Sequence, residues 1–353
     1  MDSESKKNKN NRVALLGGQW SLSVKNNHEG KERRVGVEIE FSGISSDIIV
    51  DTLVSTCGGE IEKRSLFDFS IRDSKVGDIG LELDAQILKK AVAPDNDELK
   101  QKDLEEDKQS GWKKFGEQLL KFTAEQLVPW EIVSAPLDTE QLEHFNNIIA
   151  PLREKGALGT RHAARYAFGV HLNPELPKLD SKTILAYIRS FVVLYDWIYL
   201  QEKVDPVRKL TPYIDHFGKD YLELITDSDY SPEIDQLISD YINYNPTRNR
   251  SLDCLPLFAY IDNSCVKGLD DEPLIKARPT LHYRLPNCDI DNQEWDLSFP
   301  WSLWQLVEQV ANNDQLLKKL MSHYREDLSR LTRLLDHKWE NKTFELLKDA
   351  DLL

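Results

Sequence analysis

The stretch that decides the fold is Arg34-Val-Gly-Val-Glu38-Ile-Glu40-Phe41, in which charged and apolar residues alternate. Successive side chains of a β-strand point to opposite faces of the sheet. Val37, Ile39 and Phe41 are therefore predicted to share one face, and Glu38 and Glu40 the other. An ordinary edge strand with one solvated face would show the same alternation, so this run alone does not identify a site.

Further runs of the same kind occur along the chain. They are Gly80-Leu-Glu82-Leu-Asp84, Trp130-Glu131-Ile-Val-Ser134, Phe168-Gly-Val-His171-Leu-Asn173 and Leu281-His282-Tyr-Arg284-Leu285. If these strands join one sheet with their polar positions on one side, that face collects five carboxylates, two histidines, an amide and an arginine. A hard cation with a phosphate beside it requires such a set, and acids from several strands could share two ions. Oxygen ligands favour Mg²⁺, and Mn²⁺ would also fit.

Basic residues form two clusters, Asn245-Pro-Thr-Arg248-Asn249-Arg250 and Lys276-Ala-Arg278-Pro-Thr-Leu-His282-Tyr-Arg284. Guanidinium groups bind phosphate and carboxylate oxygens in bidentate fashion, which suits a polyphosphate or an acidic substrate. Arg248 and Arg250 could equally pair with surface acids. The chain has no GxxxxGK[ST], GxGxxG or GxSxG motif, so any phosphate must be held by metal and arginine.

Composition narrows the class of protein. The 353 residues are 40% hydrophobic and 30% charged, with a net charge of -15, which argues against general affinity for nucleic acid. Cys57, Cys254, Cys265 and Cys288 show neither zinc-finger spacing nor a disulfide framework. No apolar run approaches the roughly 18 residues of a membrane helix, and the polar leader lacks the apolar core of a signal peptide. We expect a cytoplasmic protein.

The order of elements predicts an α+β fold. Helices are expected over residues 45–57, 112–127, 138–155 and 182–200, a meander of strands over 60–84, and a polar surface insertion over 94–110. Residues 1–29 are assigned to a polar, partly disordered leader and 30–300 to one catalytic domain with a helical elaboration at about 180–260. Two further helices are expected in a C-terminal segment, 301–353.

The ordered set of motifs resembles the putative amidoligase family, placed with the glutamine synthetase and glutamate-cysteine ligase superfamily. The pieces that carry the resemblance are the Arg34–Phe41 run, Leu81-Glu-Leu-Asp84, Glu131-Ile-Val-Ser-Ala-Pro-Leu137, Ala167-Phe-Gly-Val-His-Leu-Asn-Pro174, Asn245-Pro-Thr-Arg-Asn-Arg250 and Arg278-Pro-Thr-Leu-His-Tyr-Arg-Leu-Pro286. The resemblance implies a curved, mostly antiparallel sheet with flanking helices whose concave face binds ATP and two divalent ions.

The resemblance also implies residue roles. Glu38 and Glu40 match an acid pair shared between the metals, Glu131 resembles a further metal acid, His171 a histidine facing the nucleotide-side metal, and Arg284 a phosphate-contacting arginine. Where glutamine synthetase-like enzymes carry a glutamate two residues before that arginine, this chain has His282. That metal position is then weakened or passes to Glu82 or Asp84. The predicted catalytic residues are Glu40, Arg250 and Arg284, and the predicted cofactor-binding residues are Asn173, Arg248, Lys276, Arg278 and Arg284.

The implied reaction is ATP-dependent joining of a small-molecule or peptide carboxylate to an amine through an acyl phosphate. Two alternatives remain open. A non-catalytic nucleotide- or peptide-binding module would explain the change to His282, and a metal-dependent hydrolase could use the same acids and histidine to activate water. The two substrates and the oligomeric state do not follow from the sequence.

Overall fold

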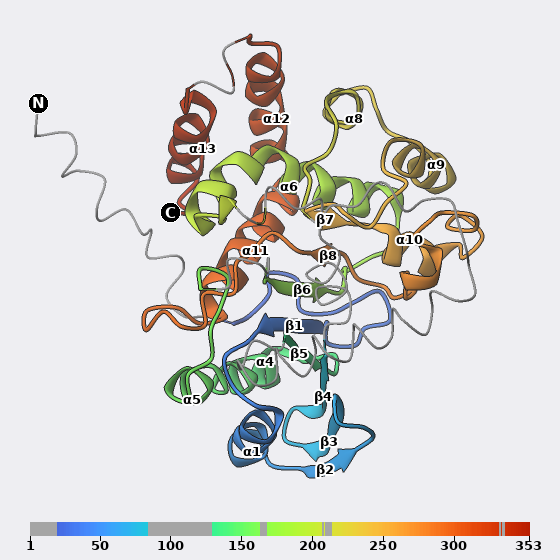
Figure 1. Cartoon of the computed structure of the whole chain (residues 1–353). Helices are drawn as coiled ribbons and strands as arrows, with labels where there is room; N and C mark the ends of the chain where they lie inside the picture. Colours follow the sequence, from blue (N-terminus) through green and yellow to red (C-terminus); the bar gives the residue numbers. More distant parts are fainter. Residues whose placement is uncertain are drawn as a thin grey trace, which may run out of the picture.

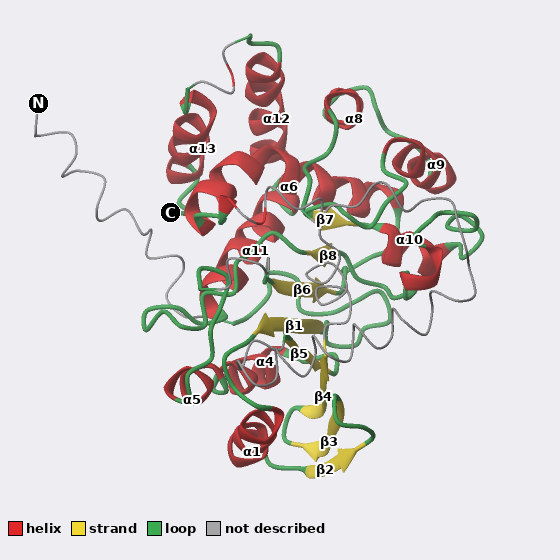
Figure 2. Ribbon diagram, in the orientation of Figure 1, coloured by secondary structure: helices red, strands yellow, loops and turns green. Residues whose placement is uncertain are grey.

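The computed structural model of the chain describes residues 20–83, 129–162, 168–206, 208, 214–331, 333 and 336–353. Its centre is an eight-stranded sheet with the order β2-β3-β4-β5-β1-β6-β8-β7, in which every described strand pair is antiparallel (Figures 1 and 2). The strands are β1 (Val35–Phe41), β2 (Glu60–Lys63), β3 (Asp68–Ser74), β4 (Gly77–Leu83), β5 (Trp130–Ser134), β6 (Val170–Pro174), β7 (Leu252–Asp253) and β8 (His282–Tyr283). The α+β class predicted from the sequence is confirmed.

The apolar face of this sheet forms the core. Directly paired residues of antiparallel strands share a face, so Ile39 lies in one row with Ile132 and Val170. All three are fully buried. The next row continues through Leu172 and Tyr283. The apolar residues of the alternating pattern therefore lie on one buried face of the sheet, as predicted.

Helices lie at both ends of the sheet. Near the β1 to β4 end are α1 (Ser46–Cys57), α4 (Thr139–Asn146) and α5 (Ile149–Glu154), and near β6 to β8 are α6 (Ser181–Glu202) and α11 (Ser298–Ala311) (Figure 1). The helices α12 (Asp314–Leu328) and α13 (Lys338–Asp349) pack against α6 on its far side from the strands (Figure 1). Between α6 and α11 in the sequence, the chain forms α8 (Lys219–Ile225), α9 (Ile234–Tyr244), α10 (Leu255–Ile261) and the 3₁₀ turn η3 (Glu272–Leu274). α11 packs on the sheet through Trp304, whose ring centroid lies 5.5 Å from that of Tyr283.

Local chemistry explains where several helices begin and end. Asp138 and Gln141 form a reciprocal capping box at the start of α4, and Asp180 accepts the Thr183 backbone amide at the start of α6. α1 ends at Gly58 and Gly59, which have φ of 73° and 98°. Residues that carry a side chain rarely adopt this left-handed backbone conformation, so glycine is favoured where the helix ends.

The helix α6 is long and apolar enough to cross a membrane by length and composition, but 61% of its apolar window is buried inside the protein. It contacts α11, α12 and α13, as a central helix of a packed core does. Length and composition therefore give only weak support for a membrane span.

The expectations about the helices after residue 137 need correction. The single helix expected over 138–155 is two helices, α4 and α5. Where two helices were expected in the C-terminal segment, its described residues form α11, α12 and α13. Leu331, expected on the apolar face of the last helix, is fully exposed at 102%. Trp20 and Leu22, assigned to the leader, are buried, and the Trp20 carbonyl accepts a hydrogen bond from Trp301. The expected helix 112–127 and insertion 94–110 lie outside the described residues.

Candidate active site

Strand register brings four of the five predicted acids, those that the structure describes, together on the second face of the sheet. Glu40 lies directly opposite Glu131 on β5, which in turn lies opposite Glu82 on β4. On the other side of β1, Glu38 lies opposite His171 on β6. Directly paired residues point the same way, so these side chains share one face. The grouping inferred from alternation is therefore present in three dimensions.

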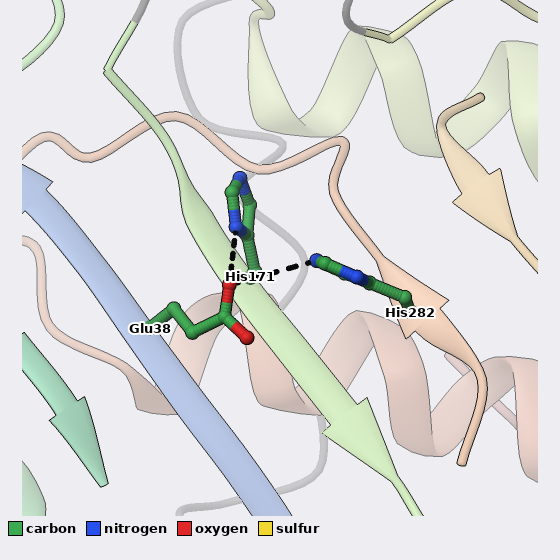
Figure 3. A group of neighbouring side chains, drawn as sticks. All are labelled: Glu38, His171 and His282. Carbon is green, nitrogen blue, oxygen red and sulfur yellow. Dashed lines mark hydrogen bonds and ion pairs between the residues drawn. The ribbon is translucent and has the colours of Figure 1, made fainter. Parts of the chain in front are cut away.

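The centre of this group is the Glu38 carboxylate, which lies between two histidines from different strands (Figure 3). Its Oε2 atom is 2.9 Å from His171 Nδ1 and 3.7 Å from His282 Nε2. Its Oε1 atom accepts a 2.9 Å hydrogen bond from the Asn173 side-chain amide and lies 3.6 Å from the Arg278 guanidinium. Both oxygens of Glu38 are thus surrounded by hydrogen-bond donors.

His171 also connects this group to the second one. Its Nε2 atom lies 3.6 Å from Glu40 Oε1, and the other Glu40 oxygen accepts a 2.7 Å hydrogen bond from the Gly169 backbone amide. Two sets of candidate ligand atoms result, in each of which the atoms lie within 4.8 Å of one another. One set is Glu38, His171 and His282, and the other is Glu40, Glu131 and His171.

Burial sets the charge of these groups. It lowers the pKa of His171 to about 4, despite the hydrogen bond to Glu38. Burial likewise holds the pKa of His282 well below its usual range. Burial alone would raise the pKa of the Glu38 carboxyl, but His282, His171 and Arg278 together outweigh it and hold that pKa well below its usual range. At neutral pH the site therefore combines an ionised carboxylate with two uncharged imidazoles.

Arginines flank the histidine side of the group. The Nε atoms of Arg248, Arg278 and Arg284 are buried and have no hydrogen-bond partner. Arg248 lies 3.8 Å from Asp253, a buried acid whose pKa burial raises to about 6. An unsatisfied guanidinium N–H is costly in a protein interior. Unused donors gathered in this way suit an anion with several oxygens, such as a phosphate.

The other predicted site residues lie further out. Glu82 shares the face of Glu131 but is exposed, and Lys276 is exposed on the loop before Arg278. The Arg250 guanidinium donates to Asn245 and to the His216 carbonyl. Asp84 lies outside the described residues.

Two neighbours of the site were missed from the sequence, Arg208 and Asp253. Asp253 is paired with His282 across β7 and β8, but both strands have only two residues, too few for a pattern of alternation to show in the sequence. The buried Arg208 guanidinium donates to the carbonyls of residues 284, 285 and 286. It also fills the space that a side chain at Gly169 would need. No sequence pattern marks a residue whose partners are backbone carbonyls about 80 positions away.

A cavity of about 390 Å³ opens beside Glu38. Its lining includes Gly36, Asn173 and Arg278 from the site, and Val133, Pro136 and Pro279 as apolar walls. Gly36 lies opposite Asn173, where an added Cβ would come within 3.4 Å of the Asn173 side chain. The Asn173 amide oxygen is buried without a partner. The cavity therefore offers a small polar and apolar space directly against the cluster.

Comparison with known proteins gives a single positive finding. Residues 31–306 match the family model described as "Putative amidoligase enzyme". Comparison with curated proteins and with solved structures returned no match.

Proposed function

Because the chain belongs to the amidoligase family, whose model spans residues 31–306, we propose that it is an ATP-dependent ligase that joins a carboxylate to an amine. The observation that carries the proposal is the juxtaposition of carboxylates and histidines with guanidinium donors on one sheet face. A glutamine synthetase-like curvature of this sheet and a cytoplasmic location belong to the same proposal.

The donor set fits a divalent ion. Glu40, Glu131 and His171 would hold Mg²⁺ or Mn²⁺, with Glu38 beside them as the partner of His171, and carboxylate oxygens with one imidazole are ligands that both ions accept. The ion would neutralise charge on the phosphate oxygens. Arg248, Arg278 and Arg284, with their unused Nε donors, would bind and orient those oxygens.

The reaction proceeds in two steps. A carboxylate oxygen attacks the γ-phosphorus, giving an acyl phosphate and releasing ADP. The amine nitrogen then attacks the acyl carbon, the amide C–N bond forms, phosphate leaves with the C–O electron pair, and the nitrogen loses a proton to solvent. The cavity beside Glu38 would hold one reactant next to the cluster, where proximity contributes to rate.

The test is ADP release by the pure protein with ATP, Mg²⁺ and a panel of carboxylates and amines. We expect ADP and an amide with at least one pair, and no turnover by Glu40→Ala. Glu60→Ala is the matched control, because Glu60 is an exposed acid of the same sheet, on β2. No ADP with any pair, together with no ATP binding by calorimetry, would refute the proposal. Binding without turnover would favour the non-catalytic module, and amide or phosphoester hydrolysis without ATP would favour the hydrolase.

A further inference from the structure

The two candidate metal groups differ in the hydrogen bonds that their histidines already make. The difference begins at His282, the residue that departs from the glutamate of glutamine synthetase-like enzymes. The Arg278 Nη2 atom lies 3.0 Å from His282 Nδ1. A guanidinium can only donate, so Nδ1 must be the acceptor and carry no proton.

This contact fixes what the other nitrogen of His282 can do. An imidazole keeps at least one ring proton, so Nε2 carries it and is a donor. That Nε2 atom is buried, has no hydrogen-bond partner within range, and lies 3.7 Å from Glu38 Oε2. A metal ligand would need a lone pair at Nε2 and a proton at Nδ1, with an acceptor as the outer partner. Arg278 can only donate, so it cannot be that acceptor.

His171 shows the reverse arrangement. Its Nδ1 atom is 2.9 Å from Glu38 Oε2, and an ionised carboxylate can only accept, so Nδ1 carries the proton. Its Nε2 atom, facing Glu40 at 3.6 Å, is the nitrogen left for an ion. Histidines that bind metals commonly donate their second N–H to a carboxylate in this way. Glu38 is then the residue that orients His171.

Charge leads to the same assignment. The Arg278 guanidinium already lies 3.6 Å from Glu38 Oε1, so a cation is present on that side of the carboxylate. A second, divalent cation there would be repelled by Arg278 at short range and in a buried setting.

Resting on the proposed function, we propose that the chain alone holds one divalent ion, between His171 Nε2, Glu40 and Glu131. Arg278 and His282 occupy the place of a second ion, as donors to Glu38. Glu38 is therefore a positioning residue, and the change from glutamate to His282 replaces a metal site with a fixed hydrogen-bond network.

The experiment counts bound Mn²⁺ per chain by equilibrium dialysis and by the electron paramagnetic resonance signal of free Mn²⁺. It uses the full chain without nucleotide, since a nucleotide brings its own ion. We expect one Mn²⁺ for the unaltered protein and for His282→Gln, and none for His171→Gln or Glu131→Gln. His323→Gln, at a partly exposed histidine on α12, is the matched control and should bind one ion. Circular dichroism checks that each variant is folded.

A second variant tests the replacement itself. Arg278→Ala combined with His282→Glu removes the competing cation and restores an acid, so we expect two Mn²⁺ per chain. Two ions or none in the unaltered protein, loss of the ion in His282→Gln, or a single ion in the double variant would overturn the proposal. The count needs no turnover. A chain that binds one Mn²⁺ but never forms ADP would sink the ligase proposal and leave this inference standing.

Discussion

Replacing Glu308 by glutamine is predicted to cost the protein a large part of its stability. Glu308 on α11 pairs with Arg33, just before β1, and the two side chains are 1% and 0% exposed. Arg33 donates to both carboxylate oxygens, at 2.9 and 2.5 Å, and Trp304 Nε1 donates to Glu308 at 3.0 Å. The substitution keeps the volume but leaves the Arg33 cation buried without its counter-charge.

The magnitude follows from this burial. Removing one partner of a buried ion pair typically costs about 3–5 kcal/mol, because the remaining charge stays desolvated. Since about 1.4 kcal/mol is a tenfold change in an equilibrium constant, the unfolding equilibrium should shift by more than 100-fold. Arg33 also donates to the Val24 and Glu175 carbonyls, which anchor it and prevent its escape to water.

The assay is equilibrium urea unfolding at pH 7, followed by tryptophan fluorescence. Glu326→Gln is the matched control, since its side chain is 75% exposed on α12, and it should leave the transition unchanged. The paired substitution Arg33→Met with Glu308→Leu should recover much of the loss, because no isolated charge remains. A loss below about 1 kcal/mol for Glu308→Gln, or a double variant no better than the single one, would refute the reasoning.

Two further predictions concern pH and the cavity. Burial raises the pKa of Glu202 to about 8, above its ordinary value of 4.5. Between these two values the folded state keeps a proton that the unfolded state has lost. The free energy of unfolding should therefore fall as pH rises from about 4.5 through 8. Glu202→Gln should flatten that slope in thermal melts and be the more stable protein at pH 8; an unchanged slope would contradict this. Gly36→Val should fill the cavity beside Glu38 and abolish amide formation while Mn²⁺ binding persists, whereas Gly218→Ala, where an added Cβ meets nothing within 4 Å, should retain activity. Full activity of Gly36→Val would exclude the cavity as a reactant site.

Much of the sheet could be predicted from local pattern. The alternation in residues 34–41 and 130–134 identified β1 and β5 and the face that each acid occupies, because a strand has a strict period of two. The helix predicted over 182–200 became α6, whose apolar residues and Asp180 cap are both local features. The predicted ends of the C-terminal helices were less accurate, because the helical spacing of leucines in the sequence continues past Leu328, where α12 ends.

What the sequence by itself determined is therefore which side chains share a face, since that depends only on neighbours along one strand. Only the tertiary structure decided which strands lie side by side, because β1 pairs with β5 and β6, strands about 95 and 135 residues away, over distances that no local pattern encodes. It also decided the roles of the two histidines. The proton on each ring is set by its partner. That partner is Glu38 on a neighbouring strand for His171, and Arg278, four residues earlier in the chain, for His282. The folded geometry of these contacts separates a nitrogen able to bind an ion from one that can only donate.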